Sequence, residues 1–236
     1  MPMEKQYTYR IIDYYDLGLI DYREAWDIQK DFYFRRVKNE IADSLFLLEH
    51  NHTYTLGKIT DKNNLIGSDD YLKSNNISVY EIDRGGDITY HGPGQIVGYP
   101  IINLEEWKKD THLYLRALED VIISTCNDFG LPASRKDKLT GVWIENRKIC
   151  AIGIKVSRWV TMHGFAFNVN TDLSLFQGII PCGIKDKEVT SLQKELDRNF
   201  SISDVKQRLL QNFIRVFGYS GYSEKSLNQI DSKILN

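Results

Sequence analysis

The segment RGGDITYHGPGQIVGYP, residues 84–100, holds five glycines and two prolines among its seventeen residues, although apolar, strand-like segments flank it. Glycine removes Cβ where a backbone turns tightly or approaches another group closely, and proline fixes φ. We therefore predict a binding site in which a ligand lies against bare backbone; a glycine-rich hairpin between two core strands is the structural alternative. The polar side chains of the segment offer a cation, a carboxylate, an imidazole and several neutral hydrogen-bonding groups: Arg84, Asp87, Thr89, Tyr90, His91 and Gln95.

Common nucleotide-binding motifs do not explain these glycines. Gly92, Gly94 and Gly98 are spaced G-x-G-x-x-x-G, one residue longer than the dinucleotide fingerprint, and the residues that follow continue as a strand instead of opening a helix. The sequence also contains no phosphate loop of the form G-x-x-x-x-G-K. The segment therefore predicts a different kind of site.

The composition around this segment is that of an ordinary soluble globular protein. The chain has 236 residues, is 42% hydrophobic and 26% charged, and carries 30 basic against 32 acidic residues. One domain of this length can bury a full core, and a net charge near zero gives no general argument for nucleic-acid binding. The apolar runs are too short to span a bilayer and the first residues lack the apolar region of a signal peptide, so we expect a cytoplasmic protein.

Periodicity predicts a single domain over residues 1–236, because no linker or internal repeat divides the chain. Residues 219–236 are expected to form a loosely ordered polar tail. Ser203 is the predicted N-cap of the last helix. Apolar spacing predicts amphipathic helices at 22–37, 111–131 and 203–217. Alternation predicts strands at 6–14, 44–50, 53–57, 77–83 and 96–102, and consecutive antiparallel strands through 142–170.

Two histidines share one predicted strand face. His50 and His52 are two residues apart, so both rings would point to the same side of a strand. A metal site is conceivable there, but the sequence offers no third ligand, and a polar strand end is the favoured interpretation. We predict no metal.

Three cysteines, at 126, 150 and 182, lack the spacing of a disulfide framework or a thiolate zinc site. Cys126 lies in a predicted helix among apolar neighbours and is interpreted as an inert core thiol. Cys182 stands between Pro181 and Gly183 on a rigid turn. Such a turn can expose the sulfur and leave backbone N–H groups free to face an oxyanion, although Pro-Cys-Gly can also be plain turn chemistry.

Four blocks of the sequence together resemble the lipoate-protein octanoyltransferases. The first helix matches as well, so the resemblance covers most of the chain. It implies a single α+β domain with a mixed, mostly antiparallel sheet flanked by helices, like the catalytic domain of biotin and lipoate protein ligases. The matching blocks are R-G-G-x-x-T-Y-H-G-P-G-Q at 84–95, K-I-x-x-x-G at 148–153, H-G-F-A-F-N at 163–168, and P-C-G at 181–183 with V-T-S at 189–191.

The resemblance implies that Cys182 accepts an acyl group and that Lys148 is its partner. An ammonium near a thiol favours the thiolate, which is the nucleophilic form. The thiolate would attack a thioester on a carrier, and one thioester would replace another. Acylation removes the negative charge beside the ammonium, so that the lysine can then take a proton from an incoming amine and an amide can form.

Other charged and polar residues have alternative interpretations. Lys155 lies seven residues from Lys148, so in one regular strand their side chains face opposite ways and only one should reach Cys182. We choose Lys148 and interpret Lys155 as a surface cation. Cys150 is expected to pack near Lys148 without reacting. His163, like His91, can either orient the acyl carbonyl or serve as a hydrogen-bonded structural histidine.

The same resemblance assigns the walls of an acyl pocket. An acyl chain is apolar and needs an apolar slot, which these residues would close with their backbone. The predicted substrate-binding residues are Arg84, Gly85, Gly86, Asp87, Ile88, Thr89, Tyr90, His91, Ala151, Ile152, Gly153, Gly164, Phe165 and Ala166, with His163 as a possible supporting residue.

The implied reaction needs neither a metal nor a nucleotide cofactor. Its donor would be octanoyl-acyl carrier protein and its acceptors lipoyl domains of 2-oxoacid dehydrogenase complexes and the glycine cleavage H protein, with neither nucleic acid nor membrane as a partner. Acyl chain length, oligomeric state, preferred acceptor and the possibility of another acylated protein as donor stay open. A basic cluster, Arg135, Lys136, Lys138 and Arg147, is a docking hypothesis against the alternative of a solvated loop.

Two other functions are compatible with the sequence. An ATP-dependent lipoate-protein ligase would share the fold and would require ATP with free octanoate or lipoate. A non-catalytic acyl-carrier-binding module would bind its partner without forming a covalent adduct.

Overall fold

The computed structural model of the protein describes residues 9–180 and 188–226. Its α-helices are α1 (Tyr22–Val37), α2 (Asp69–Ser74), α3 (Leu104–Trp107), α4 (Thr111–Asp128), α5 (Leu192–Leu196) and α6 (Ile202–Phe217), with short 3-10 helices η1 (Lys62–Asn64) and η2 (Leu173–Gly178). Its strands are β1 (Ile11–Ile20), β2 (Ser44–His50), β3 (Thr53–Leu56), β4 (Ser78–Glu81), β5 (Thr89–His91), β6 (Gln95–Ile101), β7 (Ser134–Lys136), β8 (Leu139–Ile144), β9 (Arg147–Ser157), β10 (Val160–Asn168) and β11 (Gly221–Lys225).

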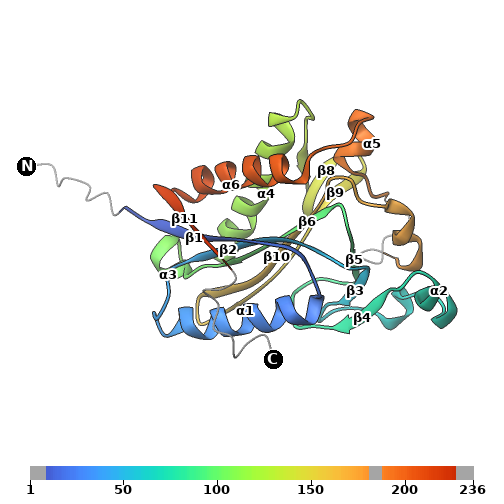
Figure 1. The fold of residues 1–236 in the computed structure, drawn as a ribbon, viewed down its shortest axis with the longest axis horizontal. Coiled ribbons are helices and arrows are strands. Elements are labelled where there is room, and N and C mark those ends of the chain that lie inside the picture. Colours follow the sequence, from blue (N-terminus) through green and yellow to red (C-terminus); the bar gives the residue numbers. More distant parts are fainter. Residues whose placement is uncertain (1–8, 181–187, 227–236) are drawn as a thin grey trace, which may run out of the picture.

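A large mixed sheet forms the centre of the molecule. Within the described residues it has eight strands in the order β11-β1-β2-β6-β10-β9-β8-β7. β1 runs parallel to β2 and β11, and the remaining neighbours are antiparallel, including the predicted consecutive strands β8, β9 and β10. Helix α1 lies on one face, and α4 and α6 lie on the other (Figure 1). The predicted mixed, mostly antiparallel sheet flanked by helices is confirmed.

Each face of the large sheet is closed by an apolar helix surface. On the α1 face, Ile28 and Phe32 are four residues apart and pack with Phe46 of β2. On the opposite face, Leu118 of α4 and Phe213 of α6 are fully buried in the larger core. Burying an aromatic or aliphatic side chain of this size contributes about 1.5–3 kcal/mol.

A smaller sheet lies at one end of the large one (Figure 1). Among the described residues it comprises three strands in the order β4-β3-β5, with β3 parallel to β4 and antiparallel to β5. Its own core contains Tyr54 and Tyr90 from the strands and Phe176 from η2. The chain passes from this sheet back into the large one between β5 and β6, so the glycine-rich segment joins the two sheets.

Several predicted boundaries are corrected by the structure. The first strand was expected at residues 6–14 but is Ile11–Ile20, since its partner is the parallel strand β2, which accompanies it from Asp13 to Ile20. The last helix was expected to begin at Ser203. Its N-cap is Ser201, whose hydroxyl accepts a hydrogen bond from the Asp204 N–H at 3.3 Å, and Ser203 lies inside the first turn.

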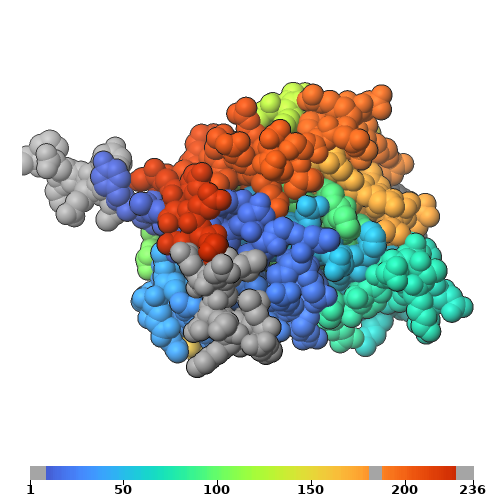
Figure 2. Space-filling view, in the orientation of Figure 1, coloured from blue at the N-terminus to red at the C-terminus, as the bar shows by residue number. Residues whose placement is uncertain are grey.

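The chain beyond Gly218, expected to be a loose tail, contains an edge strand. β11 pairs in parallel with β1 over five residues, from Ile11↔Gly221 to Tyr15↔Lys225. The red and blue ends of the described chain accordingly meet on the surface in Figure 2. Just before β11, the buried Tyr219 donates its hydroxyl to Asp43 Oδ2 at 2.8 Å. A polar composition did not reveal this strand, because its pairing is supplied by residues more than 200 positions away.

Of the helices in residues 9–180 and 188–226, none combines the length and the apolar character needed to cross a bilayer.

Replacing Tyr219 by phenylalanine tests how firmly the C-terminal stretch is attached. Tyr219→Phe removes a buried hydrogen bond to a carboxylate, and we expect it to lower the free energy of unfolding by about 1.5–3 kcal/mol in urea titrations. Tyr222→Phe is the matched control: Tyr222 is 47% exposed, so the loss in its free energy of unfolding should stay within about 0.5 kcal/mol. Equal effects from the two variants would contradict the docking of this segment through Asp43.

Candidate active site

The glycines of residues 84–86 lie against other backbone. The Gly85 N–H donates to the Ile154 carbonyl of β9 at 2.9 Å. A Cβ on Gly153 would lie 2.9 Å from the Gly85 oxygen, and one on Gly57 would lie 2.3 Å from the Gly86 oxygen. Gly86 also has a φ of +89°, which side chains disfavour. The glycines are therefore needed for contact between this loop, β9 and the end of β3, in addition to any contact with a ligand.

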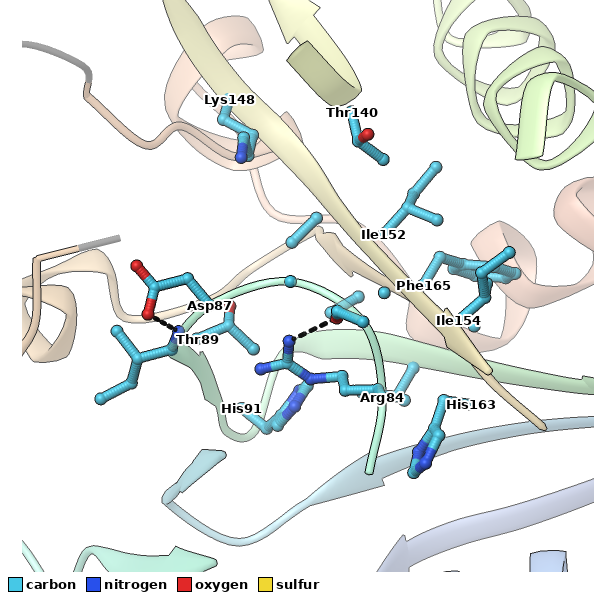
Figure 3. A pocket seen from close by; sticks show the side chains of 18 of the residues that line it. Arg84, Asp87, Thr89, His91, Thr140, Lys148, Ile152, Ile154, His163 and Phe165 are labelled. Atoms are coloured by element: carbon cyan, nitrogen blue, oxygen red, sulfur yellow. Dashed lines mark hydrogen bonds between the residues drawn. The ribbon is translucent and has the colours of Figure 1, made fainter. Parts of the chain in front are cut away.

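A cavity of about 610 Å³ lies beside this loop, within the roughly 300–1,000 Å³ typical of small-molecule sites. Figure 3 shows polar side chains toward its two ends, with Lys148 and Thr140 on one side and Arg84, His91 and His163 on the other. The stretch between them is walled by backbone and by apolar side chains from β9 and β10: Ala151, Ile152, Gly153, Ile154, Gly164, Phe165 and Ala166.

Lys148 enters the cavity from the second residue of β9. Its Nζ lies 4.8 Å from the ring centroid of Trp143 on the neighbouring strand β8. Its backbone is held from the other side, because the Lys148 N–H donates to the Glu188 carbonyl at 2.8 Å and its carbonyl accepts the Thr190 N–H at 2.9 Å. The stretch 188–190 therefore runs alongside Lys148, and Val189 also lines the cavity.

Arg84 and His91 meet at Thr55 of β3. Arg84 is buried and donates through one terminal nitrogen to the Thr55 carbonyl at 2.8 Å and to its hydroxyl at 2.9 Å. The same hydroxyl lies 3.2 Å from His91 Nε2, and His91 Nδ1 lies 2.9 Å from Gln95 Oε1. Burial lowers the pKa of His91, and the charge of Arg84 adds to the shift, so this ring is neutral near pH 7.

His163 contacts Asp83, which also binds Lys155. Its Nε2 lies 2.8 Å from Asp83 Oδ1, and Lys155 Nζ lies 2.5 Å from Asp83 Oδ2. The backbone N–H of His163 donates to Gln29 Oε1 of α1 at 2.9 Å, and the φ of His163 is 57°. Burial lowers the pKa of His163, although Asp83 opposes the shift, and the bond to His163 lowers the pKa of Asp83.

The structure separates the two candidate lysines. The cavity lining among the described residues includes Lys148 but not Lys155, whose ammonium pairs with Asp83. Lys155 is therefore a structural cation in an ion pair, instead of the simple surface charge that we expected. These two environments agree with the prediction that the side chains of Lys148 and Lys155, seven residues apart, face opposite ways.

Tyr90 was expected in the pocket and lies elsewhere. Thr89 and His91 line the cavity, while the side chain between them on β5 points to the opposite face. There Tyr90 stands edge-on to Phe176 in the small core, and its hydroxyl meets His52 Nδ1 at 2.8 Å. The remaining predicted lining residues of 84–91 all border the cavity: Arg84, Gly85, Gly86, Asp87, Ile88, Thr89 and His91.

The two histidines at 50 and 52 enter different hydrogen-bond networks. His50 contacts the Ile20 carbonyl at 2.9 Å and the Tyr99 hydroxyl at 2.8 Å, whereas His52 bonds to Tyr90. Across residues 9–180 and 188–226, no group of three His, Cys, Asp or Glu side chains is arranged to hold a metal ion.

Cys182 lies outside the described residues, so its distance from Lys148 is not part of the structure. The other two cysteines, Cys126 of α4 and Cys150 of β9, are buried in the larger core. Burial raises the pKa of the Cys126 thiol to about 12 and that of Cys150 well above its usual range, which keeps both as unreactive thiols.

The architecture and these motifs coincide with one known family. A model of the "Lipoyl protein ligase A/B catalytic domain" matches residues 21–214, from the start of α1 into α6. The chain belongs to this family.

Similar curated proteins cover nearly the same span. A protein of Cytophaga hutchinsonii named octanoyltransferase is 48% identical over 221 residues, covering 86% of this chain and 91% of its own length. One of Solibacter usitatus with the same name is 50% identical over 203 residues, with coverage of 86% and 91%. The resemblance to the octanoyltransferases is confirmed.

Solved structures of lipoate-protein ligases share the fold. Lipoate-protein ligase A bound with ATP superposes with a TM-score of 0.76 at 15% identity, covering 96% of this chain and 92% of that one. The bi-partite lipoate protein ligase of Thermoplasma acidophilum gives 0.76 at 15%, with coverage of 95% and 90%. The predicted ligase-like architecture is confirmed at the level of the fold.

The sequence did not predict several of the residues that line the cavity. Tyr22 was interpreted as a core residue because helical spacing explained it, yet it is both buried and at the cavity, with its ring 5.8 Å from that of His91. Tyr99 and Val97 were hidden inside an apolar strand. The residues around these three positions do not distinguish cavity lining from core, because the opposite wall of the cavity comes from distant parts of the chain.

The basic cluster proposed for docking is partly occupied by intramolecular ion pairs. Arg135 pairs with Glu119 at 2.7 Å, and Arg147 pairs with Glu195 at 2.8 Å. Lys138, in contrast, borders the cavity. The four residues of the predicted cluster therefore do not share one environment.

The buried histidines predict a loss of stability at mildly acidic pH. Burial lowers the pKa of His50 from 6.5 to about 4 and lowers those of His91 and His163. Below pH 6.5 the unfolded chain takes up protons that the folded protein does not, so the free energy of unfolding should fall as the pH drops from 6.5 toward 4. His50→Gln should reduce this slope by up to about 1.4 kcal/mol per pH unit.

Urea titrations across this range provide the measurement, with pH 8 as the reference at which the imidazoles are neutral in both states. A His50→Gln slope equal to that of the wild type would contradict the neutral, buried state of this ring.

Proposed function

We propose that this protein transfers an octanoyl group from acyl carrier protein to a lysine amine of lipoyl domains, through a thioester on Cys182. The observation that carries the proposal is Lys148 at one end of a backbone-walled cavity, next to the chain that leads away from Cys182. The octanoyltransferase names of relatives 48–50% identical support the acyl group and the reaction class.

In the first half of the proposed reaction, the Cys182 thiolate attacks the carbonyl carbon of the carrier thioester. The new carbon–sulfur bond forms, the bond to the carrier sulfur breaks, and the carrier thiol leaves after protonation. The ammonium of Lys148 favours the thiolate and can supply this proton. The exchange replaces one thioester by another and needs no external energy source.

In the second half, the acceptor lysine amine attacks the acyl-cysteine. An amide bond forms, the Cys182 sulfur leaves, and the amine gives up a proton to Lys148, which returns to its ammonium form. The apolar side chains Ile152, Ile154 and Phe165 suit an acyl chain, and the polar groups at the cavity ends suit its carbonyl.

The described residues on both sides of segment 181–187 support a role for it at this cavity. Before it, the Ile180 N–H donates to the Asn64 carbonyl at 2.8 Å, and Asn64 in turn donates to Asp87 of the glycine-rich segment at 2.7 Å. After it, Thr190 bonds to Lys148. The second flank is therefore anchored directly to a residue that lines the cavity, and the first is anchored through Asn64 to Asp87, which also lines it.

Acceptors of this proposed reaction are lipoyl domains of 2-oxoacid dehydrogenase complexes and the glycine cleavage H protein. One of the structures that share the fold concerns a lipoate protein ligase and its E2 lipoyl domain. Lys138 at the rim is the cation we assign to docking of an acidic carrier, in place of the ion-paired Arg135 and Arg147.

An ATP-dependent ligase is the second candidate, because lipoate-protein ligase A bound with ATP shares this fold. The two candidates differ in their requirements. A ligase needs ATP and a free acid, and it forms no acyl-cysteine.

Intact mass spectrometry distinguishes these functions. Wild-type protein incubated with octanoyl-acyl carrier protein, without ATP, should gain one octanoyl group, and Cys182→Ala should gain none. Adding a lipoyl domain should discharge the adduct onto its lysine. Lys148→Met should slow adduct formation by about a hundredfold or more, since removal of an acid–base group typically costs 10²–10⁴-fold.

Cys126→Ala and Cys150→Ala are the matched controls and should retain the adduct. An adduct that disappears with either control, or product that forms only with ATP and free octanoate, would refute the proposed chemistry.

A further inference from the structure

Two buried amides of the motif blocks have no part in the proposed chemistry. Gln95 ends the block at 84–95, and Asn168 ends the block at 163–168. Both side chains are almost fully buried, at 1% and 3% exposure, and both border the cavity. A buried amide is costly unless each of its polar atoms is paired, so the bonds it makes indicate what it holds.

One side of Gln95 connects to the Arg84 end of the cavity. The Arg84 guanidinium donates to the Thr55 hydroxyl, which faces His91 Nε2 at 3.2 Å, and His91 Nδ1 faces Gln95 Oε1 at 2.9 Å. Because Arg84 can only donate and a glutamine oxygen can only accept, the hydroxyl donates to Nε2 and the proton of neutral His91 lies on Nδ1.

The other side of Gln95 connects to Lys148. Gln95 Nε2 donates to Asn168 Oδ1 at 2.9 Å, and Asn168 Nδ2 donates to the Thr190 carbonyl at 2.9 Å. The Thr190 N–H then donates to the Lys148 carbonyl at 2.9 Å. Together with the Arg84 side, this forms a continuous series of hydrogen bonds from one polar end of the cavity to the other.

Every bond in this series points the same way. The second N–H of Gln95 donates to the Tyr90 carbonyl at 3.1 Å, so both hydrogens of its amide are used. Flipping either amide would set oxygen against a carbonyl oxygen, at Tyr90 for Gln95 or at Thr190 for Asn168. The series therefore has one low-energy arrangement, and it fixes the stretch 188–190 against Lys148.

We propose that Gln95 and Asn168 are positioning residues that hold Lys148 in place through the backbone of Thr190. The inference rests on the proposed function, because it concerns the residue that we assign as the acid–base partner. Both amides act through other groups and need not touch the acyl chain. Loss of the Asn168 bond leaves the Thr190 carbonyl unpaired and lets residues 188–190 move relative to β9.

Asn168→Asp tests the link most directly. An aspartate keeps the acceptor for Gln95 but replaces the donor that faces Thr190 by an oxygen. We expect kcat for transfer from octanoyl-acyl carrier protein to fall on the order of ten- to a hundredfold with KM for the carrier within about twofold, because a small displacement of a positioned group is enough for such a loss. Amide hydrogen exchange at Thr190 should become faster.

Asn170→Asp is the matched control. Asn170 lies just beyond the same strand and makes the same kind of bond, from Nδ2 to the Phe200 carbonyl at 2.7 Å, away from Lys148. Its replacement should lower stability comparably while leaving kcat within about twofold and Thr190 exchange unchanged. Equal losses of kcat in both variants, or a wild-type kcat in Asn168→Asp, would overturn the positioning role.

Gln95→Glu provides a second variant should Asn168→Asp not fold. It keeps the acceptor for His91 and removes both donated bonds, and the same fall in kcat at preserved KM is expected. Hydrogen exchange reports on this link without any turnover. A wild-type protein that forms no acyl-cysteine would thus refute the proposed function, whereas unchanged Thr190 exchange in both variants would refute the positioning of Lys148 alone.

Discussion

The contact that the rest of the site depends on is the direct approach of two backbones, that of residues 84–86 and that of β9. The Gly85 N–H bonds to the Ile154 carbonyl, and Gly153 leaves no room for a Cβ beside the Gly85 oxygen. This approach brings the small sheet against the large one and turns Arg84 toward Thr55. The cavity exists because two sheets meet here at a separation that only glycine permits.

Both ends of that cavity carry a cation, and burial keeps the histidines at one end neutral. One end has the ammonium of Lys148, held near Trp143, while the other has the buried guanidinium of Arg84 beside histidines that desolvation keeps neutral. Asp83, directly before the loop in sequence, is the carboxylate that contacts both Lys155 and His163. Between the ends, β9 and β10 contribute backbone and apolar side chains to the wall.

The fold alone does not choose between ligase and transferase chemistry. Lipoate-protein ligase A superposes over nearly the whole chain at only 15% identity, which shows a shared fold and leaves the chemistry to be argued from the site. What the described residues show is Lys148 at one end of the cavity, beside the stretch 188–190. The hydrogen-bond series through Gln95 and Asn168 connects residues far apart in sequence to that position.

Local sequence was sufficient to predict α1, the central antiparallel strands and the glycine-rich loop, because helical spacing, alternation and missing side chains depend on neighbouring residues. The motif blocks also indicated the family and most of the cavity lining. The orientation of Tyr90, the pairing of β11 with β1, the dual role of Tyr22 and the ion pair of Lys155 were decided only by the tertiary structure. Each depends on a partner supplied by a distant segment, and such a partner leaves no trace in the residues around the position itself.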